Sequence, residues 1–150
     1  MLVLDSTVLI AAMDRARIAH VAVRELLSSE VAKAVTTQTM RETLAVATRP
    51  MAANGLGMDF DSAWRSISAM RMACDRLLQE NDKWWASYRA LAHEIRPTGR
   101  AIYDLGQVAH VHSLGKQARL ITEDGGLCAR YEGYIQAMTV AVYQSRTTTR

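Results

Sequence analysis

Four acidic residues have the type and the placement to carry out chemistry together. Asp5 and Asp124 each follow a short apolar segment that is typical of a buried strand. Glu42 lies early in the helix expected after a second strand, and Asp104 lies near the start of the helix that leads towards Asp124. Because ligands of open parallel sheets bind beyond the carboxyl ends of the strands, we expect the four carboxylates to converge on one pocket at that edge.

Clustered carboxylates of this kind favour a divalent cation. Unpaired carboxylates that lie close together repel one another and raise each other's pKa, and a bound cation removes that cost. A site made only of oxygen ligands suits Mg²⁺ or Mn²⁺ better than zinc. Such an ion polarises a phosphodiester and lowers the pKa of bound water. The four acids therefore predict a site for metal-assisted hydrolysis.

The elements that must position these acids alternate along the chain. Strands are expected at 2–4, 34–36 and 119–122, with a candidate strand at 77–79 and a β-rich run over 135–143. A turn is expected at 123–126, and helices at about 8–13, 16–27, 40–47, 64–78, 84–95 and 101–114. This alternation predicts an α/β domain, an α/β/α sandwich with a short, mainly parallel sheet. The domain is expected to span residues 1–144, followed by a polar tail over 145–150.

Composition narrows the class of protein further. The chain has 150 residues, of which 49% are hydrophobic and 22% charged, which suits one soluble globular domain. No run reaches the ~18 apolar residues of a membrane span, and the N-terminus lacks the basic region of a secretory signal. Two cysteines, Cys74 and Cys128, make neither a disulfide framework nor a zinc site, so a cytoplasmic location is expected. The net charge of +3 permits a nucleic-acid partner without requiring one.

The motifs around the acids, taken in order, resemble PIN-domain nucleases. More closely, they resemble VapC toxins, the ribonuclease halves of bacterial type II toxin–antitoxin pairs. The segments that carry the resemblance are the opening strand at 2–10, the acidic motif at 41–50 that ends in Thr-Arg-Pro, the third acid at 103–105, the closing strand and acid at 120–124, and 129–135. The resemblance covers nearly the whole chain.

The resemblance implies a Mg²⁺- or Mn²⁺-dependent endoribonuclease that acts on RNA. It implies that Asp5, Asp104 and Asp124 hold the ion, and that Glu42 completes the ligand shell or helps to deprotonate the attacking water. Thr7 and Thr122 match positions where a polar group orients an acid or a water in the cofactor site. The resemblance further implies a cognate VapB-like antitoxin, a homodimer and no membrane partner. We expect the dimer to use helices around 64–95 or 18–26.

Some positions depart from the family pattern. Leu127 and Cys128 stand where the family commonly has a further Asp and then Phe, and Tyr103 stands where related sequences often have His. The missing acid at Leu127 puts a site with two metals in doubt. It also supports an alternative function, a non-catalytic PIN-like module that binds RNA or an antitoxin. A phosphatase of the haloacid-dehalogenase type is a second alternative, but its chemistry needs an acid at the position of Thr7.

Each acid also has a purely structural interpretation. Asp5 could cap the helix that follows it, and Thr39-x-x-Glu42 has the spacing of a capping box. Asp104 could pair with Arg100 four residues earlier, and Asp124-Gly125 could be an ordinary turn.

Two other features suggest contacts with partners. Arg41 and Arg100 are candidates to hold phosphates, and one residue of the pair Trp84–Trp85 is expected to be half exposed at a partner surface.

Overall fold

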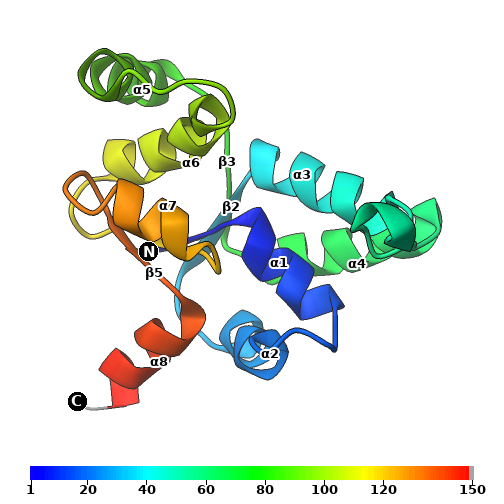
Figure 1. Cartoon of the computed structure of the whole chain (residues 1–150). Helices are drawn as coiled ribbons and strands as arrows, with labels where there is room; N and C mark the ends of the chain where they lie inside the picture. Colours follow the sequence, from blue (N-terminus) through cyan, green and yellow to red (C-terminus); the bar gives the residue numbers. More distant parts are fainter. Residues whose placement is uncertain (149–150) are drawn as a thin grey trace.

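A five-stranded parallel sheet forms the centre of the molecule (Figure 1). The computed structural model describes residues 1–148. The strands are β1 (Leu2–Leu4), β2 (Lys33–Thr36), β3 (Arg76–Leu78), β4 (Arg119–Ile121) and β5 (Gln136–Met138). Their order in the sheet is β3-β2-β1-β4-β5, and every neighbouring pair is parallel. The prediction of a short, mainly parallel sheet is therefore confirmed.

Helices connect the strands and cover the sheet. They are α1 (Ser6–Met13), α2 (His20–Ser28), α3 (Thr37–Thr48), the 3₁₀ turn η1 (Met51–Ala53), α4 (Phe60–Met72), α5 (Asp82–Ile95), α6 (Ala101–Leu114), α7 (Gly125–Arg130) and α8 (Val140–Thr148). None of the helices in the described part of the chain has the length and apolar character to cross a membrane.

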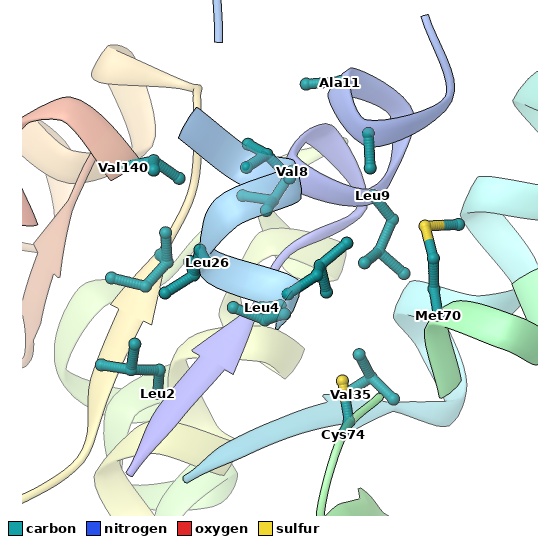
Figure 2. Close-up of a cluster of buried hydrophobic side chains, with 14 of the residues drawn as sticks. Leu2, Leu4, Val8, Leu9, Ala11, Leu26, Val35, Met70, Cys74 and Val140 are labelled. Atoms are coloured by element: carbon teal, nitrogen blue, oxygen red, sulfur yellow. The ribbon is translucent and has the colours of Figure 1, made fainter. Parts of the chain in front are cut away.

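Alternating residues of the strands face two separate hydrophobic clusters, one on each side of the sheet. Leu2 and Leu4 of β1 pack with side chains of α1, α2, α4 and α8, as Figure 2 shows for part of this cluster. Val3, between them, packs on the opposite side with side chains of α5, α6 and α7. Successive side chains of a strand point to opposite faces, so a sheet covered on both sides needs apolar residues at every position. The predicted α/β/α sandwich is confirmed.

The position of β1 in the sheet fixes where a ligand site can form. β1 pairs with β2 on one side and with β4 on the other. The chain therefore leaves β1 towards one edge of the sheet and returns to its other side, which makes a topological switch point at the carboxyl end of β1. Ligands of open α/β sheets bind in the crevice at such a point. Asp5 is the first residue after β1.

Some predicted boundaries are wrong. The second helix begins at His20 instead of residue 16, because Asp14 Oδ1 accepts the backbone N–H of Ala16 and forms a turn there. The helix predicted at 64–78 ends at Met72, and β3 covers 76–78, one residue before the candidate strand.

The segment after β4 differs most from the prediction. α7 begins at Gly125, inside the stretch 123–126 that was expected to be a turn. The β-rich run over 135–143 contains only the short β5, and α8 starts at Val140. Val140 and Tyr143 are both buried, and a spacing of three residues places them on one face of a helix. α8 continues to Thr148, through part of the expected polar tail, and residues 149–150 lie outside the described residues.

Candidate active site

All four predicted acids line one cleft of about 370 Å³ at the carboxyl edge of the sheet. Asp5 follows β1 and Asp124 lies three residues after β4, while Glu42 is in α3 and Asp104 is in the first turn of α6. The parallel sheet brings together residues that are up to 119 positions apart in the sequence (124 − 5). The cleft supports the expected placement of the acids, and their chemical roles stay predictions.

Asp5 is buried at the floor of this cleft. Its backbone N–H donates to the carbonyl of Ile121, and its Oδ2 accepts the hydroxyls of Thr7 and Thr122, each at 2.8 Å. Asp5 stands at the N-cap position of α1, but its side chain makes no capping hydrogen bond. The interpretation of Asp5 as a helix cap is therefore wrong, and its carboxylate is held by Thr7, which lines the cleft, and by the fully buried Thr122.

Thr7 and Thr122 hold the carboxylate of Asp5 from two sides of the chain. Thr7 Oγ1 accepts the backbone N–H of Glu123 at 2.9 Å, and Thr122 Oγ1 accepts that of Asp124 at 3.1 Å. Each hydroxyl has one proton, and both can donate it to Asp5 while the backbone groups occupy their acceptor sites. The two hydroxyl oxygens lie 3.1 Å apart. The start of α1 and the loop after β4 are thus joined through one carboxylate oxygen.

Glu42 is held by two neighbours on different elements. Its Oε2 accepts the hydroxyl of Ser6 at 2.8 Å, and its Oε1 accepts the amide of Gln38 at 2.7 Å. Ser6 Oγ also lies 3.5 Å from Asp5 Oδ1, so its hydroxyl stands between the two acids. The contact of Ser6 with Glu42 is the shorter one, so Oδ1 of Asp5 has only a long contact with Ser6.

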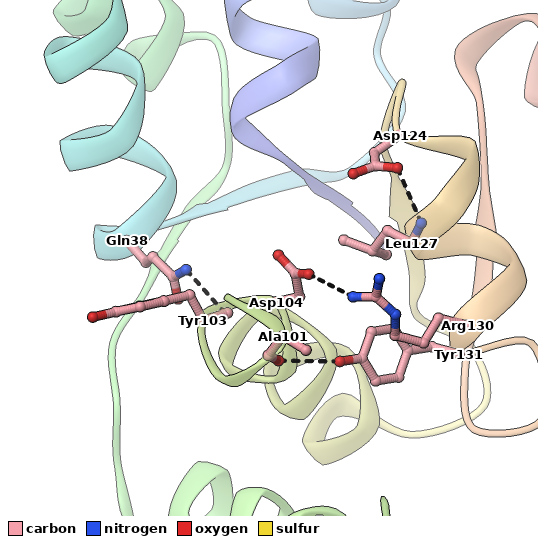
Figure 3. Close-up of polar contacts among 8 residues, drawn as sticks. All are labelled: Gln38, Ala101, Tyr103, Asp104, Asp124, Leu127, Arg130 and Tyr131. Atoms are coloured by element: carbon pink, nitrogen blue, oxygen red, sulfur yellow. Dashed lines mark hydrogen bonds and ion pairs between the residues drawn. The ribbon is translucent and has the colours of Figure 1, made fainter. Parts of the chain in front are cut away.

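The helix caps near the site differ from the expected ones. Thr36 caps α3, because its Oγ1 accepts the backbone N–H of Thr39, and Glu42 takes no part in that cap. The alternative interpretation of Glu42 as part of a capping box is therefore wrong. Asp124 does have a structural role, as the N-cap of α7, and its Oδ1 accepts the backbone N–H of Leu127 at 3.1 Å (Figure 3). Its Oδ2 makes no hydrogen bond with any residue that the structure describes.

Asp104 pairs with Arg130, instead of with Arg100 as the local spacing suggested. Arg130 Nη1 donates to Asp104 Oδ2 at 3.0 Å (Figure 3). The pKa of Asp104 is nevertheless raised, first by burial and then by the charges of Asp124 and Asp5, while Arg130 and Arg100 oppose the rise. This repulsion is what three carboxylates that line one cleft are expected to exert on one another.

Two arginine side chains line the cleft, and only one of them was expected. Arg100 lines the cleft, as does Arg49 from the end of α3. Arg41 is exposed and is not among the residues that line the cleft, so the structure does not place it at this site. Arg49 belongs to the Thr-Arg-Pro segment that ends the second acidic motif.

Sequence reasoning missed three residues that hold the acids: Ser6, Gln38 and Arg130. Gln38 lies four residues before Glu42 on the same helix, a spacing that brings side chains together, so this pair could have been found. Ser6 is adjacent to Asp5 and could have been considered a polar partner. Arg130 is separated from Asp104 by 26 positions, and no local pattern connects them.

The four carboxylates that line the cleft, with the hydroxyls of Ser6 and Thr7, offer the oxygen ligands that suit a hard divalent cation. The positions of these groups do not yet form a complete ligand shell for a metal ion. Among residues 1–148, no three or more His, Cys, Asp or Glu side chains are placed so that they could hold a metal ion together. Asp104 is turned towards Arg130, and Glu42 is tied to Ser6 and Gln38. The side chains would have to move to complete a ligand shell.

Solved structures of VapC-type proteins share this fold. The chain is similar to VapBC-1 from nontypeable Haemophilus influenzae, with 18% identity, a TM-score of 0.67, and coverage of 93% of this chain and 98% of that one. It is similar to VapBC2 from Rickettsia felis bound to a promoter DNA fragment, with 12% identity, a TM-score of 0.68, and coverage of 92% and 97%. A third is VapC20 from Mycobacterium tuberculosis, described as a sarcin–ricin loop cleaving toxin, with 15% identity, a TM-score of 0.62, and coverage of 91% and 98%.

The fold is therefore the α/β fold of VapC-type PIN domains, which these structures share over nearly their whole length. No protein-family model matches the sequence, and no curated protein matches it. The likeness lies in the course of the backbone, with little identity of residues.

Proposed function

We propose that this protein is a Mg²⁺- or Mn²⁺-dependent endoribonuclease and the toxin of a toxin–antitoxin pair. The observation that carries the proposal is the convergence of Asp5, Glu42, Asp104 and Asp124 on one cleft at the switch point of a VapC-type fold. The similar VapC20 is described as a toxin that cleaves the sarcin–ricin loop, which supports RNA as the substrate.

In this proposal the cleft residues have separate tasks. Asp5, Asp104 and Asp124 would hold the cation, which when bound polarises the phosphodiester and makes water a stronger nucleophile. Oδ1 of Asp5 and Oδ2 of Asp124 already lack a short hydrogen bond within the described chain. Glu42 would accept a proton from the attacking water, and Ser6 and Gln38 keep its carboxylate directed into the cleft.

The remaining groups of the cleft would position the substrate. Thr7 and Thr122 fix the orientation of Asp5 through its Oδ2, which would leave Oδ1 to the cation. Arg49 and Arg100 supply positive charge on the walls of the cleft, where the negative charge of an RNA phosphate would be. Stabilising the charge that develops on the phosphate is the largest contribution such a site can make.

One observation favours the alternative of a non-catalytic module. Leu127, which stands where the resemblance has an acid, is buried and lines the same cleft. An apolar side chain there removes one possible ligand and supports a single ion over two. If four acids do not suffice for cleavage, the same cleft would bind RNA or an antitoxin without cutting.

We further propose a VapB-like antitoxin as partner, a homodimer and action in the cytoplasm. Several of the similar structures are VapBC proteins, which supports the antitoxin. A ribonuclease without a neutralising partner would damage its own cell. Co-expression with a small antitoxin-like protein encoded beside this chain, if the genome has one, followed by purification of a stable complex, tests the proposed antitoxin.

The central test is a cleavage assay on total RNA. We expect cleavage by the wild type with Mg²⁺ or Mn²⁺, no cleavage with EDTA, and none by Asp5→Asn. The exchange preserves side-chain size, and the Asn carbonyl can still accept both threonine hydroxyls, so the variant should fold. Binding of RNA without cleavage would instead support the non-catalytic module. Cleavage that resists EDTA and persists in Asp5→Asn would overturn the proposed site.

A further inference from the structure

A second hollow, of about 520 Å³, adjoins the acidic cleft. It shares Arg100, Asp104 and Asp124 with that cleft, and Arg130 lines it without lining the cleft itself. Thr98 and Ala101 complete the lining. The two hollows therefore share two acids and one arginine, and the second hollow adds Arg130.

The chemistry of the second hollow suits a phosphate group. Arg100 and Arg130 are both exposed, and Thr98 adds a hydroxyl. A guanidinium presents a fork of donors that matches phosphate oxygens, so two of them on one hollow favour an anion. Within the described chain, Arg100 has no carboxylate at ion-pair distance, so its donors are available.

Arg130 is held beside Asp104 by the packing of α7 against α6. The next residue, Tyr131, is fully buried, and its hydroxyl donates to the carbonyl of Ala101 at 3.2 Å (Figure 3). This anchor places Arg130 at the end of α7 over the first turn of α6. The side chain of Arg130 is 48% exposed and that of Asp104 is 23% exposed, so solvent screens the pair and a competing anion can reach it.

We propose that the second hollow binds an RNA phosphate next to the one that is cut, and that this phosphate draws Arg130 away from Asp104. In the free protein Arg130 pairs with Asp104 and occupies its Oδ2, one of the two oxygens that a cation in the cleft could use. When the phosphate takes the guanidinium, Asp104 is released to join Asp5 and Asp124. The inference rests on the proposed ribonuclease function, and it makes assembly of the acidic site depend on the substrate.

Two binding measurements without turnover test this exchange. The first measures binding of an RNA hexanucleotide in EDTA as a function of salt. Arg130→Ala and Arg100→Ala should each weaken binding roughly tenfold. Each should also lower the slope of log affinity against log salt by about 0.7, the value for one lost phosphate contact on a single strand. Arg89→Ala, which removes an exposed arginine of α5, is the matched control and should change neither quantity.

The second measures Mn²⁺ binding in the absence of RNA, by electron paramagnetic resonance of the free ion. Arg130→Ala should bind Mn²⁺ roughly two- to fivefold more tightly than Arg89→Ala, because an exposed ion pair of this kind has that strength. Arg100→Ala removes a charge from the same hollow without breaking the pair, so its increase should be smaller. In an Asp104→Asn background, Arg130→Ala should give no further increase.

The outcomes separate the inference from the proposed function. Unchanged hexanucleotide affinity and salt slope in Arg130→Ala and Arg100→Ala would overturn the phosphate site. Equal Mn²⁺ affinity in Arg130→Ala and Arg100→Ala would overturn the exchange and leave only a general effect of charge. Either result can occur in a protein that cleaves RNA. Failure of the wild type to cleave RNA, with these binding effects present, would instead remove the proposed enzyme activity.

Discussion

At the scale of single residues, the acids of the cleft are held by partners of different kinds. Asp5 is fixed by two threonine hydroxyls, Glu42 by a serine and a glutamine, and Asp104 by an arginine. The neutral partners orient a carboxylate and leave its charge in place. Only Arg130 cancels a charge, which makes Asp104 the acid whose availability depends most on its surroundings.

Replacing Asp104 by Asn should abolish cleavage and leave the folded protein as stable as the wild type, or more stable, at neutral pH without metal. Burial, Asp124 and Asp5 raise the pKa of Asp104, so the charged form costs free energy in the folded state. This cost is present above the folded pKa and disappears as the pH falls below the unfolded value of about 3.9. The advantage of the variant, about 1 kcal/mol or less because Arg130 offsets part of the cost, should therefore vanish in acid. Urea unfolding of both proteins in EDTA across this pH range measures it.

Replacing Thr122 by Val should lower both stability and cleavage. The side chain is fully buried, and the exchange keeps its shape but leaves the N–H of Asp124 without its acceptor and Asp5 without one donor. Buried groups that lose a partner cost about 1–3 kcal/mol. Thr122→Ser keeps the hydroxyl and should retain most of the activity. Equal cleavage by the Val and wild-type proteins would contradict the role of the Thr122 hydroxyl in orienting Asp5.

At the scale of elements, α5 and α6 pack as a pair on one side of the sheet. Trp84 of α5 donates its indole N–H to the carbonyl of Gly106 at 3.0 Å, and its ring lies 5.6 Å from that of His110. α6 carries Asp104 in its first turn, so this contact helps to fix the position of Asp104, which lines both hollows. Burial lowers the pKa of His110 from its ordinary value of 6.5 to about 4.

The buried His110 should make the protein sensitive to acid. The folded state holds the neutral imidazole, so its contribution to stability is complete above pH 6.5 and is lost as the pH falls towards 4. One unit of pKa corresponds to about 1.4 kcal/mol, so the loss is a few kcal/mol at most. His110→Leu should flatten the dependence of the unfolding free energy on pH between 6.5 and 4. His112→Leu, at an exposed position of the same helix, is the control, and identical pH profiles for wild type and His110→Leu would refute the prediction.

At the scale of the whole molecule, several large apolar side chains lie on the surface. Phe60 and Trp64 of α4 are 60% and 54% exposed and stack with ring centroids 6.1 Å apart. Trp85 is 55% exposed, so the expectation that one tryptophan of the pair 84–85 is half exposed is confirmed. Ile18, before α2, is fully exposed. Exposed aromatic groups of this size favour contact with a partner.

We predict that the protein is a homodimer and that the Phe60–Trp64 stack contributes to its interface. Aromatic residues in the centre of an interface commonly contribute 2 kcal/mol or more to binding, at about 1.4 kcal/mol for each tenfold change. Trp64→Ser should therefore weaken the dimer at least about tenfold, and Trp85→Ser, at the other exposed tryptophan, should weaken it less. Light scattering over a range of concentrations measures both. A wild-type monomer at high micromolar concentration, with antitoxin absent, would contradict the prediction.

The fold and the place of the site could largely be read from the sequence. Short apolar runs ending in acids, separated by helical patterns, predict a parallel sheet with Asp5 and Asp124 at one edge. Helix α8 could not be predicted from the sequence, because its β-branched residues favour a strand. In the structure Val140 and Tyr143 are buried together on one face of a helix. Local preference was overridden there by packing.

The amino-acid sequence by itself determined which residues carry charge and hydroxyl groups. It also indicated that two acids follow strands and that two lie early in helices. Only the tertiary structure decided which groups meet. Ser6 reaches Glu42 because α1 and α3 both start at the same edge of the sheet. Arg130 reaches Asp104 because Tyr131 anchors α7 on α6. Such contacts depend on the packing of distant elements, and the spacing of residues along the chain does not encode them in any local pattern.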